Sequence, residues 1–280
     1  MRRQDFEQLG DLFSTFFNTS ILDTIREGQY GVHAVKHHDF GDELVGELDK
    51  KLEQRYFTFF DEHFPNDHVV SEETKHEWPP PHDKFWIIDP CDGTHNMLSG
   101  NPCFGTVAAR VENGIVAFCA IFLPHDRTFG ESGCYIAGRD CGSWRWNSNG
   151  DNHRLHVSET HSLEKSFLLI EGPSKRVLAS SCARLLMQRA RFFRKISATS
   201  WSGVLVASGG EYPSGCSGLI CFESSPWDTL PVALLIREAG GTISDFQGAP
   251  LTVRNYANLV MSNGQIHDQI LSEILKPTIS

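Results

Sequence analysis

A run of apolar residues that ends in two carboxylates most restricts how this chain can fold. Residues 86–96 read WIIDPCDGTHN, so an apolar tripeptide leads directly into Asp89 and Asp92. Removing a charge from water is costly unless a partner balances it. The pattern therefore predicts a hydrophobic strand whose end meets a cation or hydrogen-bond donors.

The order of the expected elements indicates the α/β class. Apolar residues recur at helical spacing in some segments, and short apolar runs bounded by turn residues predict strands in others. We expect helices at residues 4–26, 42–62, 180–189, 201–208, 229–239 and 266–275. We expect strands at residues 66–70, 85–88, 103–110, 115–122, 128–136, 166–170, 218–222, 242–245 and 259–261. This alternation predicts stacked layers of helix and sheet.

The chain is long enough for one large α/β domain or two fused halves. It has 280 residues, and a polar segment rich in Gly, Asn and Trp at 142–153 is the best candidate for a boundary. We therefore expect an N-terminal α/β part at 1–150 and a C-terminal α/β part at 151–280.

Charge and cysteine content narrow the class of partner. The formal net charge is −10, which argues against a nucleic-acid surface. An anionic substrate stays possible, because a bound metal ion can reverse the local field. The eight cysteines show no zinc-site spacing, so we expect reduced thiols in a cytoplasmic protein.

The longest apolar run, residues 115–123, is too short to span a membrane.

The DPCDGT segment itself favours a metal site. Pro90 stiffens the turn and Gly93 permits an unusual backbone angle, so Asp89, Asp92 and the carbonyl of Cys91 can converge. Carboxylate and carbonyl oxygens suit Mg²⁺ or Mn²⁺. Taken alone, however, a DxxDG segment is more often a capped turn.

Two further acidic signals support the metal interpretation. Glu72 and Glu73 follow an expected strand, and Asp228 begins an expected helix. Separately, these are typical of a solvated loop and of a helix cap. Their order along the chain, together with the first motif, predicts one shared metal site.

The motifs together resemble the inositol monophosphatase superfamily of Mg²⁺-dependent, lithium-sensitive phosphatases. The matching segments are WIIDPCDGTHNM at 86–97, WDTLPVALLIREAGG at 227–241, SEE at 71–73 and a degraded ELVGELD at 43–49. The resemblance covers residues 43–270 with comparable spacing. It implies an αβαβα sandwich, a phosphomonoesterase that binds two or three Mg²⁺ ions (with Mn²⁺ as a possible substitute), and a homodimer.

The resemblance also implies the metal ligands. Glu72, Asp89 and the carbonyl of Cys91 would hold a first ion, and Asp89, Asp92 and Asp228 a second. Glu72 would help to place a third ion through water. It counts for that reason among the implied catalytic residues.

The remaining implied roles concern water, phosphate and the rest of the substrate. Asp49 and Thr94 would activate the attacking water, and the N–H groups of Gly93 and Thr94 would bind phosphate. For Asp49, a solvated helix face is the alternative interpretation. His95 is a candidate contact to the leaving group, although an exposed histidine without a role is equally compatible with its position.

The substrate side departs from the family pattern, which indicates a divergent member. Ser197, Ala198 and Thr199 align with a family G-S-A-A segment as candidate substrate contacts. Inositol-active members place a Glu seven residues before the second-motif Asp, where this chain has Cys221; the nearest Glu is Glu223.

We therefore expect hydrolysis of a small polar phosphate, such as an inositol-phosphate-like, sugar, polyol or amino-alcohol phosphate. The alternatives are a 3′(2′),5′-bisphosphonucleotide phosphatase and a weakly catalytic regulatory protein that binds metal or phosphate.

Overall fold

The apolar run before Asp89 forms part of a strand inside a large sheet. In the computed structural model this strand, β4 (Lys84–Asp92), is buried from Phe85 onward. The structure describes residues 1–28, 31–38, 41–74, 77–126, 132–147 and 149–275. Within these ranges, no helix combines the length and the apolar character needed to cross a bilayer.

The sheet that contains β4 has seven strands in the order β3-β4-β5-β6-β7-β8-β9. β3 runs parallel to β4, and the other neighbours are antiparallel. The other strands are β3 (His68–Ser71), β5 (Gly105–Glu112), β6 (Ile115–Leu123), β7 (Gly133–Gly138), β8 (Gly142–Trp146) and β9 (His153–Arg154). β8 and β9 lie in the segment that we expected to be a boundary, so the division at residue 150 stays a prediction.

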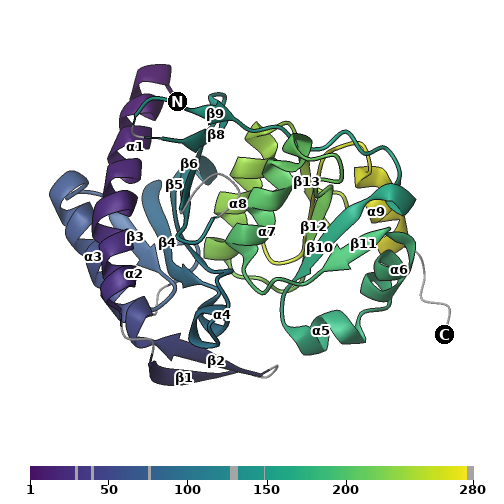
Figure 1. Ribbon diagram of the computed structural model, residues 1–280, viewed down its shortest axis with the longest axis horizontal. Helices are drawn as coiled ribbons and strands as arrows, with labels where there is room; N and C mark the ends of the chain where they lie inside the picture. Colours follow the sequence, from purple (N-terminus) through teal and green to yellow (C-terminus); the bar gives the residue numbers. More distant parts are fainter. Residues whose placement is uncertain (29–30, 39–40, 75–76, 127–131, 148, 276–280) are drawn as a thin grey trace.

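Helices rich in aromatic residues cover one face of this sheet (Figure 1). They are α1 (Arg3–Phe16), the π-helical η1 (Phe17–Ile21), α2 (Leu22–Glu27) and α3 (Glu47–His63). Phe13, Phe17 and Tyr56 pack there with Trp86 and Phe118 of the sheet. The expected helix at 4–26 is therefore confirmed, with a π-helical segment in its middle.

The expected helix at 42–62 begins too early. Residues 41–46 form β2 (Gly41–Gly46), which pairs with β1 (Val32–His38) as an antiparallel hairpin. α3 begins at Glu47 because Gly46 is extended and its N–H donates to the carboxylate of Asp49 at 3.0 Å. The spacing of apolar residues along the chain does not show where such a helix begins, because the boundary is set by a capping contact.

The opposite face of the seven-stranded sheet meets α7 (Thr199–Ala207) and α8 (Pro226–Glu238), which lie between the two sheets (Figure 1). The second sheet has the order β11-β10-β12-β14-β13. Its strands are β10 (Phe167–Glu171), β11 (Phe192–Arg194), β12 (Gly218–Cys221), β13 (Thr242–Asp245) and β14 (Leu259–Ser262).

A last helical layer covers the second sheet and completes the expected αβαβα sandwich. It comprises α5 (Ser174–Ala179), α6 (Ser181–Arg189) and α9 (His267–Ile274), which share an apolar core with β10, β12 and β14. α5 and β11 were not expected from the sequence. The strand expected at 128–136 begins at Gly133, and residues 128–131 lie outside the described ranges. Three short helices complete the described elements: α4 (Thr94–Leu98), which follows β4 after Gly93, and the 3-10 helices η2 (Leu163–Lys165) and η3 (Gly209–Glu211).

Candidate functional site

A β-bulge places Asp89 and Asp92 on the same face of the sheet. In a regular strand, residues three apart point to opposite faces. Here Asp89 pairs with Val107 and Asp92 with Gly105, so three steps along β4 match two along β5. The extra residue reverses the alternation, and Pro90, which has no N–H to pair, lies inside the irregular stretch.

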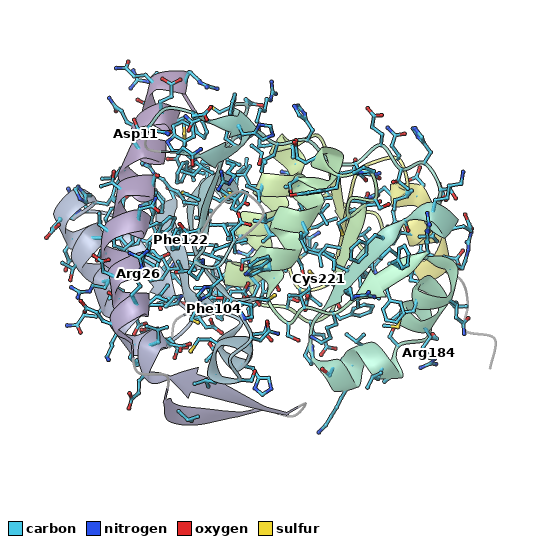
Figure 2. The ribbon with its side chains drawn as sticks, in the orientation of Figure 1. Asp11, Arg26, Phe104, Phe122, Arg184 and Cys221 are labelled. Atoms are coloured by element: carbon cyan, nitrogen blue, oxygen red, sulfur yellow. The ribbon has the colours of Figure 1, made fainter. Side chains whose placement is uncertain are left out.

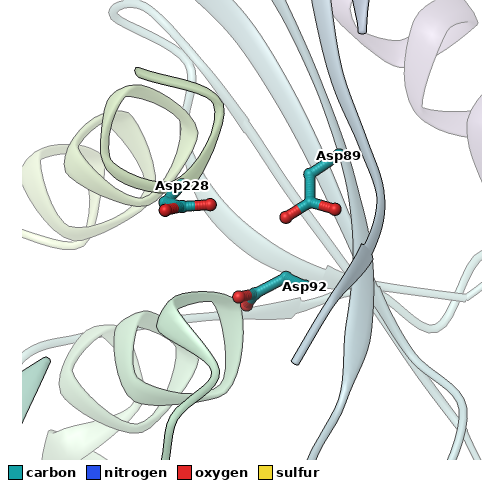
Figure 3. Close-up of side chains that lie close together, drawn as sticks. All are labelled: Asp89, Asp92 and Asp228. Carbon is teal, nitrogen blue, oxygen red and sulfur yellow. The ribbon is translucent and has the colours of Figure 1, made fainter. Parts of the chain in front are cut away.

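Asp228 reaches the same space from the first turn of α8 (Figure 3). One carboxylate oxygen from each of Asp89, Asp92 and Asp228 lies within 4.8 Å of the others. Burial raises the pKa of Asp89 well above its usual range, and the charges of Asp92 and Asp228 raise it further. Burial also raises the pKa of Asp92. The three carboxylates converge and repel one another. A divalent cation such as Mg²⁺, which prefers carboxylate oxygens as ligands, would balance their charge.

The carboxylate of Asp92 is held by the first turn of α7. The N–H of Thr199 donates to its Oδ1 at 3.1 Å, and the N–H of Ser200 donates to its Oδ2 at 2.5 Å. Since these N–H groups have no partner inside the helix, the contact both caps α7 and orients Asp92. The candidate substrate residue Thr199 thus contacts a candidate metal ligand through its backbone.

Glu72 and Cys91 lie beside Asp89. A hydrogen bond with the side chain of Glu72 acts to lower the pKa of Asp89, against the larger effect of burial. The N–H of Glu72 also donates to the carbonyl of Ile88 at 3.2 Å, which fixes the end of β3 next to β4. The buried Cys91 donates its own N–H to Oδ1 of Asp89 at 2.9 Å.

Asp49 and Thr94 form a pair at the edge of this cluster. The hydroxyl of Thr94 donates to Oδ1 of Asp49 at 2.6 Å and also lies 2.9 Å from the carbonyl of Cys91. Asp49 is almost completely buried, so the alternative interpretation as part of a solvated helix face is wrong. Burial raises the pKa of Asp49 to about 6, although the hydrogen bond from Thr94 lowers it.

Gly93 lies where the chain turns from β4 into α4. Its φ is +92°, and a Cβ on it would lie 3.0 Å from the Cβ of Ala198 and 3.1 Å from the carbonyl of Cys103. Any other residue would therefore push the Ala198 segment away. His95 follows one residue after Thr94, and its side chain is exposed.

Ser197 adopts a left-handed backbone with φ of +62°. Glycine adopts this conformation most easily, and glycine is the residue that the resemblance placed at this position. Cys221 is completely buried at the end of β12 (Figure 2). Glu223 is instead half-exposed, and its Oε2 accepts a hydrogen bond from Nε of Arg176 at 2.9 Å.

Sequence reasoning missed Glu171, a buried carboxylate at the end of β10. It accepts hydrogen bonds from the N–H groups of Ile196 at 2.9 Å and Ser197 at 3.0 Å, and from the hydroxyl of Ser202 at 2.7 Å. Nζ of Lys195 lies 3.4 Å from its Oε2. The signal was present, because Glu171 ends an apolar run just as Asp89 does.

Sequence reasoning also missed Asn96. Its side chain binds the segment that begins at Ile196, through a backbone carbonyl. Its Nδ2 donates to the carbonyl of Ile196 at 2.8 Å and to that of Cys103 at 2.7 Å. Nothing in the local pattern distinguishes this Asn from a surface residue of a short helix.

Comparisons with known proteins agree with this geometry. Residues 20–277 match the model of the inositol monophosphatase family. The chain is 27% identical over 237 residues to the fructose-1,6-bisphosphatase/inositol-1-monophosphatase of Thermotoga maritima, covering 83% of this chain and 82% of that protein. It is 30% identical over 223 residues to inositol monophosphatase 2 of Homo sapiens, covering 75% and 70%. A solved IMPase structure from Thermotoga maritima matches with a TM-score of 0.76 at 25% identity, covering 91% and 92%.

Proposed function

The chain belongs to the inositol monophosphatase family of metal-dependent phosphomonoesterases, and from this premise we propose that it hydrolyses a small polar phosphate ester with Mg²⁺. One observation carries the proposal. The carboxylates of Asp89, Asp92 and Asp228 converge from two separate elements. Asp49, which accepts the hydrogen bond from Thr94, is near enough for its charge to raise the pKa of Asp89 as well.

We assign the metal ligands as follows. Asp89, Asp92 and Asp228 would hold one ion, and Glu72, Asp89 and the Cys91 carbonyl another, with Glu72 helping to place a third through water. When bound, Mg²⁺ supplies charge stabilisation of the phosphoryl oxygens and lowers the pKa of coordinated water.

The protein's own groups would position the water and the phosphate. The carboxylate of Asp49 accepts the hydrogen of the Thr94 hydroxyl. The lone pairs of that hydroxyl are then able to accept a hydrogen from the attacking water, which fixes its direction of approach. Because the pKa of Asp49 is about 6, this arrangement is available mainly above that pH. The N–H groups of Gly93 and Thr94 are our candidates for binding phosphate.

The substrate side favours a phosphate other than that of myo-inositol. A buried thiol stands at Cys221, where inositol-active relatives carry a carboxylate, and Glu223 is engaged with Arg176. Ser197, Ala198, Thr199 and the exposed His95 are the proposed contacts. A sugar, polyol or amino-alcohol phosphate remains the proposed class, with inhibition by millimolar Li⁺ carried over from the family.

We further propose a cytoplasmic protein, because all eight cysteines are free thiols. A homodimer is proposed from the family and from the exposed aromatic edge of the second sheet at β11.

The test is phosphate release from a panel of inositol, histidinol, glycerol, sugar and 3′-nucleotide phosphates, with and without Mg²⁺. Asp92→Asn should reduce turnover by more than about 100-fold, since even indirect partners of metals contribute factors of 10 to 100. Mg²⁺ should raise the melting temperature of the wild type by binding the native state, and should do so much less for Asp92→Asn.

Asp61→Asn is the matched control, because Asp61 is an exposed aspartate on α3. Its turnover should equal that of the wild type. Full activity of Asp92→Asn would refute the metal assignment. Binding of Mg²⁺ without release of phosphate from any compound would favour the regulatory alternative.

A further inference from the structure

A cavity of about 550 Å³ lies at the opposite end of α8 from Asp228. Arg237, in its lining, follows Asp228 by nine residues, which is about 14 Å along a helix axis. The turn between β7 and β8 and the first residues of α1 form other walls, near the N-terminus in Figure 1. The volume falls within the range of small-molecule sites.

Cationic side chains converge on this cavity. Arg3, Arg154 and Arg237 contribute guanidinium groups to the lining, and His156 contributes an imidazole. The guanidinium carbons of Arg3 and Arg154 lie 5.1 and 5.8 Å from the ring centroid of Trp144. One indole therefore contacts two guanidinium groups, in a protein whose net charge is −10.

Other groups already engage the two carboxylates of the lining. Glu238 accepts the N–H of Asp140 at 3.1 Å and that of Gly142 at 2.9 Å. The carboxylate of Asp140 is 86% exposed and lies 3.9 Å from Nε of Arg139. Within the described ranges, neither Arg154 nor Arg237 has a side-chain hydrogen bond or an ion pair. Arg154 lies over the Trp144 ring and Arg237 is attracted by the charge of Glu238, but the N–H donors of both side chains are available to an anion.

We propose that this cavity binds a phosphate-bearing polyanion and is a second ligand site, separate from the carboxylate cluster. A guanidinium group offers a planar pair of donors that matches two phosphate oxygens. The two sites differ in chemistry, because the carboxylate cluster repels anions until a cation is bound, whereas the arginine cavity needs no metal.

The experiment is calorimetric titration of the full chain with inorganic pyrophosphate in EDTA at low salt. We expect saturable binding by the wild type and equal binding by Asp92→Asn. Arg154→Ala and Arg237→Ala should each weaken binding at least about 10-fold, as expected for loss of a charge-assisted contact. Both side chains are exposed, so their removal should leave the fold intact.

Arg184→Ala is the matched control, since Arg184 is an exposed arginine on the far part of the molecule (Figure 2). Its affinity should equal that of the wild type. Absence of binding by the wild type would overturn the proposal. Equal loss in Arg184→Ala, or unchanged affinity in the double variant Arg154→Ala/Arg237→Ala, would also overturn it.

Discussion

Glu171 fixes the segment that in turn holds the carboxylate of Asp92. It accepts the N–H groups of Ile196 and Ser197, while Asn96 donates to the carbonyl of Ile196. Two residues further on, Thr199 and Ser200 donate to Asp92. The orientation of the proposed metal ligand therefore depends on a carboxylate that does not contact the cluster oxygens directly, which makes Glu171 a positioning residue.

Glu171→Gln should weaken Mg²⁺ binding by about 10- to 100-fold, the usual effect of losing an indirect partner of a metal. The Gln amide has nearly the same shape as the Glu carboxylate. Its NH₂ group, however, is a donor and would face the backbone N–H groups that now donate to Glu171. Mg²⁺ affinity measured by calorimetry is the readout, with exposed Glu62→Gln on α3 as the control. A lower melting temperature with unchanged Mg²⁺ affinity would show that Glu171 supports only the fold.

The raised pKa of Asp49 predicts a pH-dependent stability of the metal-free protein. Its pKa rises from the usual 3.8 to about 6, which corresponds to about 3 kcal/mol. A carboxyl group with a raised pKa contributes stability that is fully present below about pH 4 and is lost as the pH rises through 6.

In EDTA, Asp49→Asn should therefore be more stable than the wild type at pH 7, and this advantage should shrink as the pH falls to 5. Urea unfolding of both proteins at pH 5, 6 and 7 measures the difference. A difference in free energy of unfolding that stays constant with pH would contradict the assignment of this titration to Asp49.

At the scale of elements, two helices aim their first turns at the bulge in β4. α7 contributes N–H groups to Asp92, and α8 contributes Asp228. Their relative position depends on close contact at Gly203, because a Cβ there would lie 2.3 Å from Cγ1 of Val232. The packing of α7 on α8 thus sets the distance between carboxylates that lie far apart in the sequence.

Gly203→Ala should destabilise the protein by about 1–3 kcal/mol through overpacking and should also weaken Mg²⁺ binding. Denaturant unfolding and Mg²⁺ titration measure the two effects. Gly203→Ala/Val232→Ala should recover part of the lost Mg²⁺ affinity, since removing two methyl groups restores the space. No loss in the single variant would show that the helices move apart without consequence for the site.

At the scale of the whole molecule, the second sheet has an exposed apolar edge. β11 is an edge strand, and Phe192 and Phe193 on it are 46% and 41% exposed. Leu185 on the neighbouring α6 is also exposed. An open strand edge with aromatic residues favours association with a second copy of the chain.

The wild type should therefore sediment as a dimer, and Phe192→Glu/Phe193→Glu as a monomer, in analytical ultracentrifugation. The substituted side chains are exposed, so the double variant should keep its fold by circular dichroism. Leu178→Glu, an exposed apolar residue on α5, is the control and should remain dimeric. A monomeric wild type, or a dimeric double variant, would contradict the use of this edge.

Local patterns were sufficient for much of the fold. Apolar spacing predicted α1, the body of α3, α8 and most strands, because a helix face or a buried strand must match the core beside it. The motif residues were likewise visible: Asp89 and Asp92 because carboxylates after an apolar run require balancing charge, and Asp228 because it begins a helix in a second matching motif. The sequence by itself thus determined the class, the layers and the chemistry of the candidate site.

Tertiary structure decided how these residues meet. The β4 bulge depends on pairing with β5. The hairpin depends on pairing of β1 with β2, a strand that overlaps the start of the expected helix at 42–62. The role of Glu171 depends on donors more than 20 residues away. Such features arise from register and packing between distant segments, which the spacing of residues within one segment does not encode. The same long-range contacts bring Asp228 to Asp89 and gather three arginines around the second cavity.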